Sequence, residues 1–311
     1  MASQPIGAPT WFPCNDRPDD RARYRIALTT EAAYTVAVTG RPVEVSRGSV
    51  TSTWRFESSV PMATHLAAVH IGPYRELPID AADARGGQIG RILYANGHAA
   101  IARRTFQDVP RIMAVFEDAF GPYPQEDCTI VFTPDDLEIP LEAQGMAVFG
   151  ANHTDEASKR LIAHELAHQW FGNSVGVARW HDIWLNEGFA CFAEWLWSER
   201  SGGPTIAEHA DAHYARLRML PRDIVLSDPG AGRMFDDRVY KRGALVLEAL
   251  RRTVGDAVFA TLLREWAATH RHGLVTTADF RSCVAIVTGS SHRALLTAWL
   301  DRPELPELPP R

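Results

Sequence analysis

The chain has 311 residues, of which 46% are hydrophobic and 23% are charged. These proportions are typical of globular proteins and exclude a largely disordered chain, and the length predicts about two domains. The formal net charge of −6, from 32 basic and 38 acidic residues, argues against a nucleic-acid partner and gives no reason to expect binding to an anionic membrane.

The segment before Pro73 is predicted to be rich in β-strands. YRIALTT, YTVAVTG and VTSTWRFESS alternate apolar and polar side chains, contain many β-branched residues and are separated by Gly or Pro. MATHLAAVHIG is a further candidate strand. The pattern changes at Gly72-Pro73, and we place a domain boundary there.

The rest of the chain is predicted to change from mixed structure to helices. Helices are expected at 99–107 and at VPRIMAVFEDAF, a buried strand at CTIVF, and a second, more exposed strand within LEAQGMAVFG. The Pro-rich end of the chain cannot continue a helix and is expected to be a loose tail. From Asp155 onward, helices are expected at 155–171, 184–200, 205–220, 237–253, 256–270, 277–287 and 292–300.

One helical segment contains an arrangement of candidate metal ligands. In the pattern HELAH, His164 and His168 lie four residues apart and therefore on one face of a helix, where both imidazoles can bind one metal ion. Glu165 follows the first ligand and can reach a metal-bound water. The pattern is short, and the alternative is a partly buried helix whose histidines are hydrogen-bonded. HADAH (209–213) has the same spacing without the glutamate, and we interpret it as a solvated helix face.

A second segment, WLNEGFACFAEWLW, supplies a third candidate ligand. Glu187 lies 19 positions after His168 (187 − 168 = 19), which leaves room for a turn and a second antiparallel helix. A carboxylate among apolar neighbours needs a partner, which a dication or an arginine such as Arg179 can provide. Two histidines and one carboxylate leave a fourth position for water, the layout of a catalytic zinc site. We therefore predict one zinc ion on His164, His168 and Glu187, with Glu165 as the general base of amide hydrolysis.

These motifs resemble those of a known enzyme family. HELAHQWFGN followed at this spacing by WLNEGFA is similar to the gluzincin zinc metalloaminopeptidases of the aminopeptidase N and leukotriene hydrolase family. WFPCNDRPDDRARYRI resembles the end of the family's N-terminal β domain, and AFGPYPQEDCTIVF resembles the segment that leads into its thermolysin-like catalytic domain. The resemblance extends over roughly residues 11–300.

The resemblance implies an α+β fold. It places a thermolysin-like zinc metallopeptidase catalytic domain at 74–303, mostly helical in its C-terminal half. A partial N-terminal β domain is expected at 1–73, because the chain begins late in the family's β domain, and a Pro-rich tail is expected at 304–311. The chain is thus expected to be a short, N-terminally truncated member of the family.

The resemblance also implies a catalytic role for Tyr240. The segment VYKRGA is similar to the family's Tyr-Glu-Lys-Gly segment, whose tyrosine hydroxyl stabilises the tetrahedral oxyanion. Tyr240 is therefore expected to have that role. The alternative is a residue near the start of a helix that packs and hydrogen-bonds locally.

The expected substrate anchor departs from the family pattern. The family has Gly-(Ala/Gly)-Met-Glu-Asn, whose glutamate binds the substrate's free α-amine. If Leu-Glu at 141–142 matches Met-Glu, Glu142 is the anchor; if Gly-Met at 145–146 is matched literally, an apolar residue takes the acidic position and the anchor is lost. We prefer Glu142, with Gln144 as an additional polar contact to the substrate.

The expected function is that of a zinc-dependent aminopeptidase that removes N-terminal residues from peptides through a metal-activated water. Its partners are expected to be peptide substrates with a free N-terminus. The alternative is a zinc-bound but catalytically weak peptide-binding module, because the anchor departs from the family and the chain is short. No sequence feature indicates hydrolysis of another small substrate, as in the leukotriene branch. The sequence does not indicate an oligomeric state.

Cysteine usage and the N-terminal residues favour a cytoplasmic protein. The first residues, MASQPIGAPTWFPCND, lack the basic and apolar segments of a secretory signal. The cysteines at positions 14, 128, 191 and 283 are scattered and show no CxxC spacing. We therefore expect reduced thiols and a cytoplasmic location.

Overall fold

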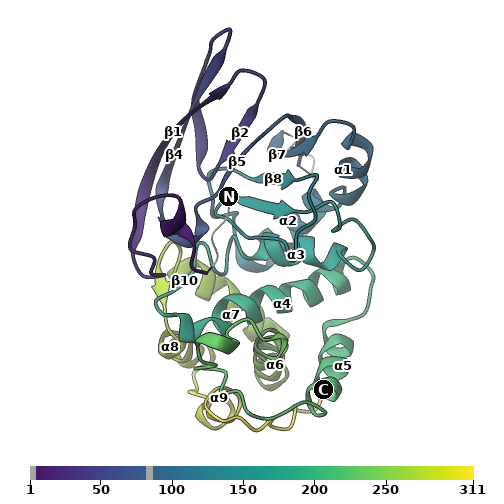
Figure 1. Cartoon of the computed structure of the whole chain (residues 1–311). Helices are drawn as coiled ribbons and strands as arrows, with labels where there is room; N and C mark the ends of the chain where they lie inside the picture. The colour runs from purple at the N-terminus through teal and green to yellow at the C-terminus, as the bar shows by residue number, and fades with distance from the viewer. Residues whose placement is uncertain (1–4, 82–86) are drawn as a thin grey trace. The chain divides into compact units, whose positions relative to one another are not determined.

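The computed structural model describes residues 5–81 and 87–311 and divides into two compact units (Figure 1). One unit comprises Met1–Ala114 and Pro124–Gln169, and the other comprises Val115–Tyr123 and Trp170–Arg311. Long strands dominate the start of the chain and helices its second half, which confirms the expected α+β class. Domain boundaries at residues 73 and 303 stay a prediction.

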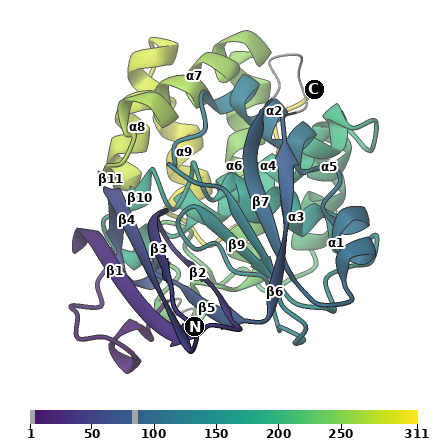
Figure 2. The same ribbon diagram turned by 90° about the horizontal axis from the view of Figure 1, so that it is seen from above.

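The N-terminal strands form two small sheets in the first unit. β1 (Arg21–Glu31) pairs antiparallel with β4 (Thr51–Ala63), which also pairs with β3 (Arg41–Arg47), and the three strands lie side by side in Figure 2. β2 (Thr35–Val38) pairs antiparallel with β5 (Val69–Gly72). A small apolar cluster fills their inner faces, and its buried members are Val36, Val38, Trp54 and Phe56. The three strands predicted from alternating patterns are confirmed as β1, β2 and β4.

Two details of this region differ from the sequence-based expectation. MATHLAAVHIG is not one strand, because the chain turns after β4 through a 3-10 helix, η2 (Thr64–Leu66), before β5 begins. The hydroxyl of Thr64 donates to Asp16 over 2.7 Å and fixes this turn. β3 was not predicted, because its apolar alternation is limited to Val43 and Val45, and nearly all of its side chains are exposed.

A third sheet has the strand order β6-β7-β8-β9. β6 (Tyr74–Asp80) and β7 (Gln88–Ala95) are antiparallel, and β8 (Thr129–Phe132) and β9 (Met146–Phe149) continue the sheet in parallel. All residues of β8 and β9 are buried. The expectation of a more exposed strand within LEAQGMAVFG is therefore wrong: β9 is the last strand of the sheet, but all of its residues are buried, and Leu141 bridges to Val148. β6 and β7 were not predicted.

The helices agree closely with the sequence-based expectation. α4 begins and ends at the expected residues, and the other expected helices differ by a few residues at their ends. None of the helices within residues 5–81 and 87–311 combines the length and apolar composition that a bilayer crossing requires. The helices are α1 (Ala99–Thr105), α2 (Val109–Phe120), α3 (Lys159–Ala167), α4 (Trp184–Arg200), α5 (Ile206–Leu217), α6 (Asp237–Val254), α7 (Asp256–Thr269), α8 (Thr277–Thr288) and α9 (Arg293–Leu300).

Short elements complete the second unit. β10 (Gly176–Val177) pairs in parallel with β11 (Leu274–Val275). Single 3-10 turns occur at η3 (Trp180–Asp182) and η4 (Ala231–Arg233), and η1 (Ala8–Thr10) lies in the first unit. None of the four cysteines, all of which lie within the described residues, forms a disulfide; Cys14 is half-buried and the other three are buried.

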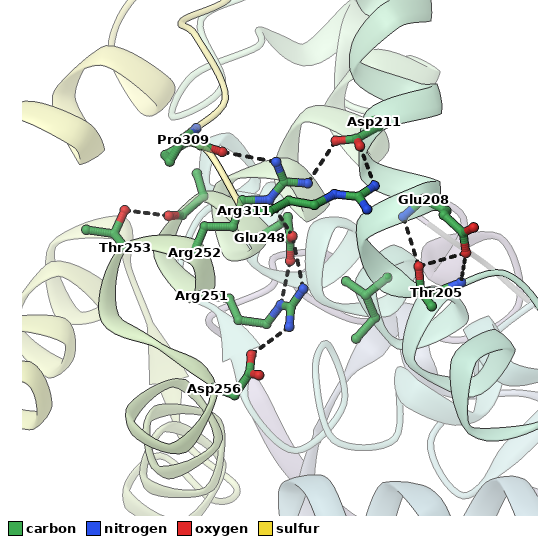
Figure 3. A network of polar contacts seen from close by, with 12 residues as sticks. Thr205, Glu208, Asp211, Glu248, Arg251, Arg252, Thr253, Asp256, Pro309 and Arg311 are labelled. Carbon is green, nitrogen blue, oxygen red and sulfur yellow. Dashed lines mark hydrogen bonds and ion pairs between the residues drawn. The ribbon is translucent and has the colours of Figure 1, made fainter.

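The Pro-rich tail is held in place, so the expectation of a loose end is wrong. The buried Arg242 guanidinium donates to the carbonyl oxygens of residues 302, 303 and 304. Farther along the tail, the Tyr214 hydroxyl donates to Pro306 O over 3.0 Å. Arg252 Nη1 donates to Pro309 O over 3.0 Å (Figure 3). A segment without helix or strand hydrogen bonds is thus ordered by side-chain donors from α5 and α6.

A buried carboxylate organises the arginines that reach this tail. Glu248 is fully buried and accepts from Arg251 Nε over 2.6 Å and from Arg252 Nε over 2.7 Å. Arg252 also bonds Asp211 on α5 over 2.9 Å, and the side chain of Arg311 contacts the same carboxylate (Figure 3). Charge-assisted hydrogen bonds offset the cost of desolvating Glu248. The same network therefore joins α5, α6 and the chain end.

Acidification is expected to weaken the first unit through His65, which lies in η2 and is 9% exposed. Burial, reinforced by the positive charge of Arg21, lowers the pKa of His65 to about 4. The unfolded chain takes up a proton near its ordinary pKa of about 6.5, whereas the folded chain does not until about pH 4. The contribution of neutral His65 to stability is therefore complete above pH 6.5 and is lost as the pH falls toward 4, by about 1.4 kcal/mol per pH unit.

Urea unfolding between pH 7.5 and 4.5 measures this effect. We expect the free energy of unfolding of His65→Gln to depend less steeply on pH than that of the wild type between pH 6.5 and 4.5. Carboxylates that titrate in the same range are common to both proteins, so the difference isolates His65. Equal slopes in the two proteins would contradict the assignment.

Candidate metal centre

The three residues predicted as metal ligands lie together. His164 is in the last turn of α3, His168 is its C-terminal cap, and Glu187 is in the first turn of α4. Each offers one ligand atom, and these atoms all lie within 4.8 Å of one another. The two imidazole rings are 4.7 Å apart, centre to centre, at an angle of 81°. The rings are therefore close enough to approach one ion.

The donor set suits a single zinc ion. Zinc binds histidine nitrogen and carboxylate oxygen, and two histidines with one glutamate is a common set of protein ligands at catalytic zinc. Glu187 is only 2% exposed, and a carboxylate so far from water is stabilised by a bound dication. Arg179, the alternative partner considered for Glu187, is exposed. The residues present thus fit the predicted metal.

The helix that carries the two histidines is shorter than the expected 155–171. The Asp155 carboxylate accepts from the backbone N–H of Ser158 over 2.8 Å, which holds a turn ahead of the helix. At the other end the Gln169 N–H bonds a carbonyl three residues back and tightens the last turn. The His168 N–H still bonds His164 O over 3.2 Å. The helical relation that directs both imidazoles to one side is thus retained up to the second histidine.

The start of α4 is fixed by polar contacts to α8. The Asp182 carboxylate accepts from the backbone N–H of Thr277 over 2.9 Å and from its hydroxyl over 2.6 Å. The indole N–H of Trp184 donates to the same hydroxyl over 2.9 Å. Glu187 follows within one turn, and its N–H bonds Ile183 O over 3.1 Å. These contacts orient the first turn of α4, from which Glu187 projects.

Two glycines let α4 and α6 approach closely. A Cβ atom added to Gly188 would lie 2.7 Å from Gly243 Cα, and a Cβ atom added to Gly243 would lie 2.7 Å from Gly188 Cα. Neither position accepts a larger side chain unless the helices separate. Gly188 follows Glu187 directly, and Gly243 lies one turn after Tyr240, which is half-buried. The crossing therefore brings together the helices that carry a candidate ligand and a candidate catalytic residue, and sequence reasoning missed it.

The candidate base and the candidate anchor are both buried. Glu165 lies on α3 beside His164, and Glu142 lies just ahead of the turn that leads into β9. Glu142 Oε1 is 4.0 Å from His168 Nε2. The structure thus places the preferred anchor carboxylate next to one of the two candidate imidazole ligands.

Gln144 borders a different surface from Glu142. Its buried side chain lines a hollow in the first unit. Within the described part of the chain, neither Glu142 nor the candidate ligands line that hollow. The other lining residues are Gly40, Ser58, Val60, Gln125, Glu126, Asp127 and Gly145.

The second histidine pair is not a solvated helix face, so that interpretation is wrong. His209 and His213 are half-buried, and their rings stack on Trp195 of α4 at interplanar angles of 7° and 8°. Burial lowers the pKa of His213 to about 4. Of the residues that the structure describes, only His164, His168 and Glu187 form a group of three ligand residues close enough to share a metal ion.

Comparison with known proteins gives consistent results along the chain. Residues 104–299 match the family model described as the Peptidase family M1 domain, and residues 2–66 match the Peptidase M1 N-terminal domain. Aminopeptidase M1-A of Oryza sativa subsp. japonica is 27% identical over 97% of this chain and 37% of its own length. The chain spans little more than a third of the length of such curated relatives.

Solved structures show the same relationship in three dimensions. An M1 zinc metallopeptidase from Deinococcus radiodurans, crystallised with a Tyr-Ser-Ala substrate, is 33% identical, with a TM-score of 0.89 over 99% of this chain and 70% of that one. Yeast LTA4 hydrolase is 22% identical and shares the fold, with a TM-score of 0.83 over 98% of this chain and 50% of its own. The two family models together match most of the chain, and the chain belongs to peptidase family M1.

Proposed function

We propose that this chain is a zinc-dependent aminopeptidase that hydrolyses N-terminal residues from peptides. The observation that carries the proposal is the buried group of His164, His168 and Glu187. Membership of family M1 supports it, as does the peptide substrate bound to the Deinococcus relative. We infer that the three residues hold one zinc ion, which when bound acts as a Lewis acid and lowers the pKa of water.

The chain's own residues then divide the work of amide hydrolysis. The Glu165 carboxylate accepts a proton from the attacking water and delivers it to the nitrogen of the leaving amine. The Tyr240 hydroxyl donates a hydrogen bond to the oxyanion that develops on the substrate carbonyl. The Glu142 carboxylate binds the substrate's ammonium group, which restricts cleavage to the first peptide bond.

Backbone geometry supports the register that makes Glu142 the anchor. Leu141 and Val148 form an antiparallel bridge, with N···O distances of 3.0 and 2.9 Å, so the chain reverses between them. Gly145 has a φ of +69° in this reversal. In the literal Gly-Met register, the position of the family's anchor glutamate would be Ala147 or Val148, which are buried apolar residues of β9. Glu142 has a carboxylate oxygen 4.0 Å from His168 Nε2.

A chromogenic assay tests the proposal. The zinc-loaded chain is expected to release p-nitroaniline from L-alanine p-nitroanilide and to act at least about tenfold more slowly on the N-acetylated form, which lacks the ammonium group that Glu142 would bind. Equal rates on the two substrates would contradict the anchor. Bound zinc without chelator-sensitive turnover would instead support the catalytically weak peptide-binding module.

A further inference from the structure

The side-chain amide of Gln169 bridges two backbone groups of another segment. Gln169 is 1% exposed. Its Oε1 accepts from the backbone N–H of Gly145 over 2.8 Å, and its Nε2 donates to Ala143 O over 3.1 Å. The amide oxygen and the amide nitrogen thus both form hydrogen bonds, to the residues on either side of Gln144. A primary amide is the side-chain group that can donate and accept in this way without a net charge.

The backbone of the bridged segment has few alternative positions. The Gln144 N–H donates to Leu66 O over 3.1 Å, and Gly145 O accepts from the Thr129 N–H over 2.9 Å. The backbone carbonyl of Gln169, just past the end of the histidine helix, accepts from Gln125 Nε2 over 2.9 Å, a bond separate from the two made by the side-chain amide. The two bonds from the Gln169 amide tie the segment directly to that helix end.

The residues adjacent in sequence to the bridged ones are candidate functional residues. Gln169 follows His168 directly, and Ala143 follows Glu142 directly. The hydrogen bond from Gln169 to Ala143 O therefore joins the residue after the candidate ligand His168 to the residue after the candidate anchor Glu142. Glu142 Oε1 and His168 Nε2 lie 4.0 Å apart.

We propose that Gln169 is a positioning residue that fixes the Glu142 carboxylate relative to His168. The inference rests on the proposed function, because it assigns Gln169 the task of setting the distance between the amine anchor and the metal-binding residues. That distance determines whether the first peptide bond of a free-amine substrate lies at the reacting position. Gln169 itself contacts the backbone of the anchor segment, so its effect on the substrate passes through Glu142.

Two substitutions distinguish the contributions of the two hydrogen bonds made by the Gln169 amide. Gln169→Glu keeps an oxygen that accepts from Gly145 but replaces the donor to Ala143 O by a carboxylate oxygen, which repels that carbonyl. Gln169→Leu removes both bonds at similar size. Gln125→Leu is the matched control, because it removes a hydrogen bond to the Gln169 backbone and leaves both amide bonds of the bridge in place.

The first measurement is steady-state kinetics of the zinc-loaded full chain on L-alanine p-nitroanilide. We expect KM to rise about tenfold in Gln169→Glu and in Gln169→Leu, while kcat falls less and zinc stays at one ion per chain. Gln125→Leu should change KM by less than about twofold. An unchanged KM in both Gln169 variants overturns the proposal. Loss of zinc in them also overturns it, because Gln169 would then act on His168 and not on the anchor.

The second measurement does not depend on activity. Amide hydrogen exchange of the wild type should be slow at the Gly145 N–H and accelerate at least about tenfold in Gln169→Leu. Fast exchange in the wild type overturns the bridge itself. If the zinc-loaded wild type proves inactive, the proposed function fails, whereas hydrogen exchange still decides whether Gln169 holds the anchor segment.

Discussion

Replacement of Glu165 by glutamine is expected to lower kcat for L-alanine p-nitroanilide by roughly 10²–10⁴-fold while zinc remains bound. Glutamine has the size of glutamate, but its amide cannot take a proton from water at neutral pH. Glu165 is 4% exposed, so bulk water cannot easily replace it as the base. His164, His168 and Glu187 are unchanged in the variant, so its zinc content should equal that of the wild type.

Metal analysis alongside the kinetic assay makes this result specific. Glu156→Gln is a suitable control, since Glu156 is exposed, lies ahead of the same helix and forms an ion pair with Lys159. The control should keep the activity and zinc content of the wild type. A Glu165→Gln variant that retains bound zinc and more than about a tenth of wild-type kcat would show that another group moves the proton.

The candidate ligands could be predicted because helical spacing alone determines which side chains share a face. His164 and His168 are one turn apart on any α-helix. Glu187 was predicted because a carboxylate among Trp, Leu and Phe residues needs a partner. The helix that bears it is buried at every position from Trp184 to Trp197 and has the expected ends.

The features that sequence reasoning missed depend on contacts between distant segments. The bonds from Gln169 to Ala143 and Gly145 join residues 24 to 26 positions apart, and no local pattern reports them. The contact of Gly188 with Gly243 likewise becomes visible only when two helices cross. Such positions have ordinary residue types and acquire their role from tertiary packing.

The two wrong predictions, a loose tail and a solvated histidine pair, also arise because contacts between distant segments are not visible in the sequence. The prolines of the tail correctly exclude a helix, but composition cannot show that Arg242 and Arg252 supply the hydrogen bonds the tail lacks. His213 has a polar side chain, and only the structure shows its ring against Trp195. Residue type alone thus predicted exposure of these segments, whereas ring stacking and buried hydrogen-bond donors hold them against the rest of the protein.

Zinc is expected to stabilise the metal-free wild type strongly, and Glu187→Gln should abolish most of that effect. A ligand that binds only the folded state adds about 2.7 kcal/mol when its free concentration is about 100 times Kd. For a chain of this size such a gain raises Tm by several degrees. An amide is a poorer zinc ligand than a carboxylate, so the variant should show little zinc-dependent rise in Tm and at least about a 100-fold lower activity at the same free zinc.

The two forms of the protein should respond to this substitution in opposite directions. In the metal-free state, the substitution replaces a buried negative charge by a neutral amide, so Glu187→Gln should be at least as stable as the wild type. With zinc, the wild type should be the more stable, so the order of the two Tm values reverses. Glu265→Gln, at an exposed position of α7, serves as a control and should keep the full zinc-dependent shift. An equal shift in Glu187→Gln and the wild type would exclude Glu187 as a ligand, because a lost ligand must reduce the binding free energy that zinc adds to folding.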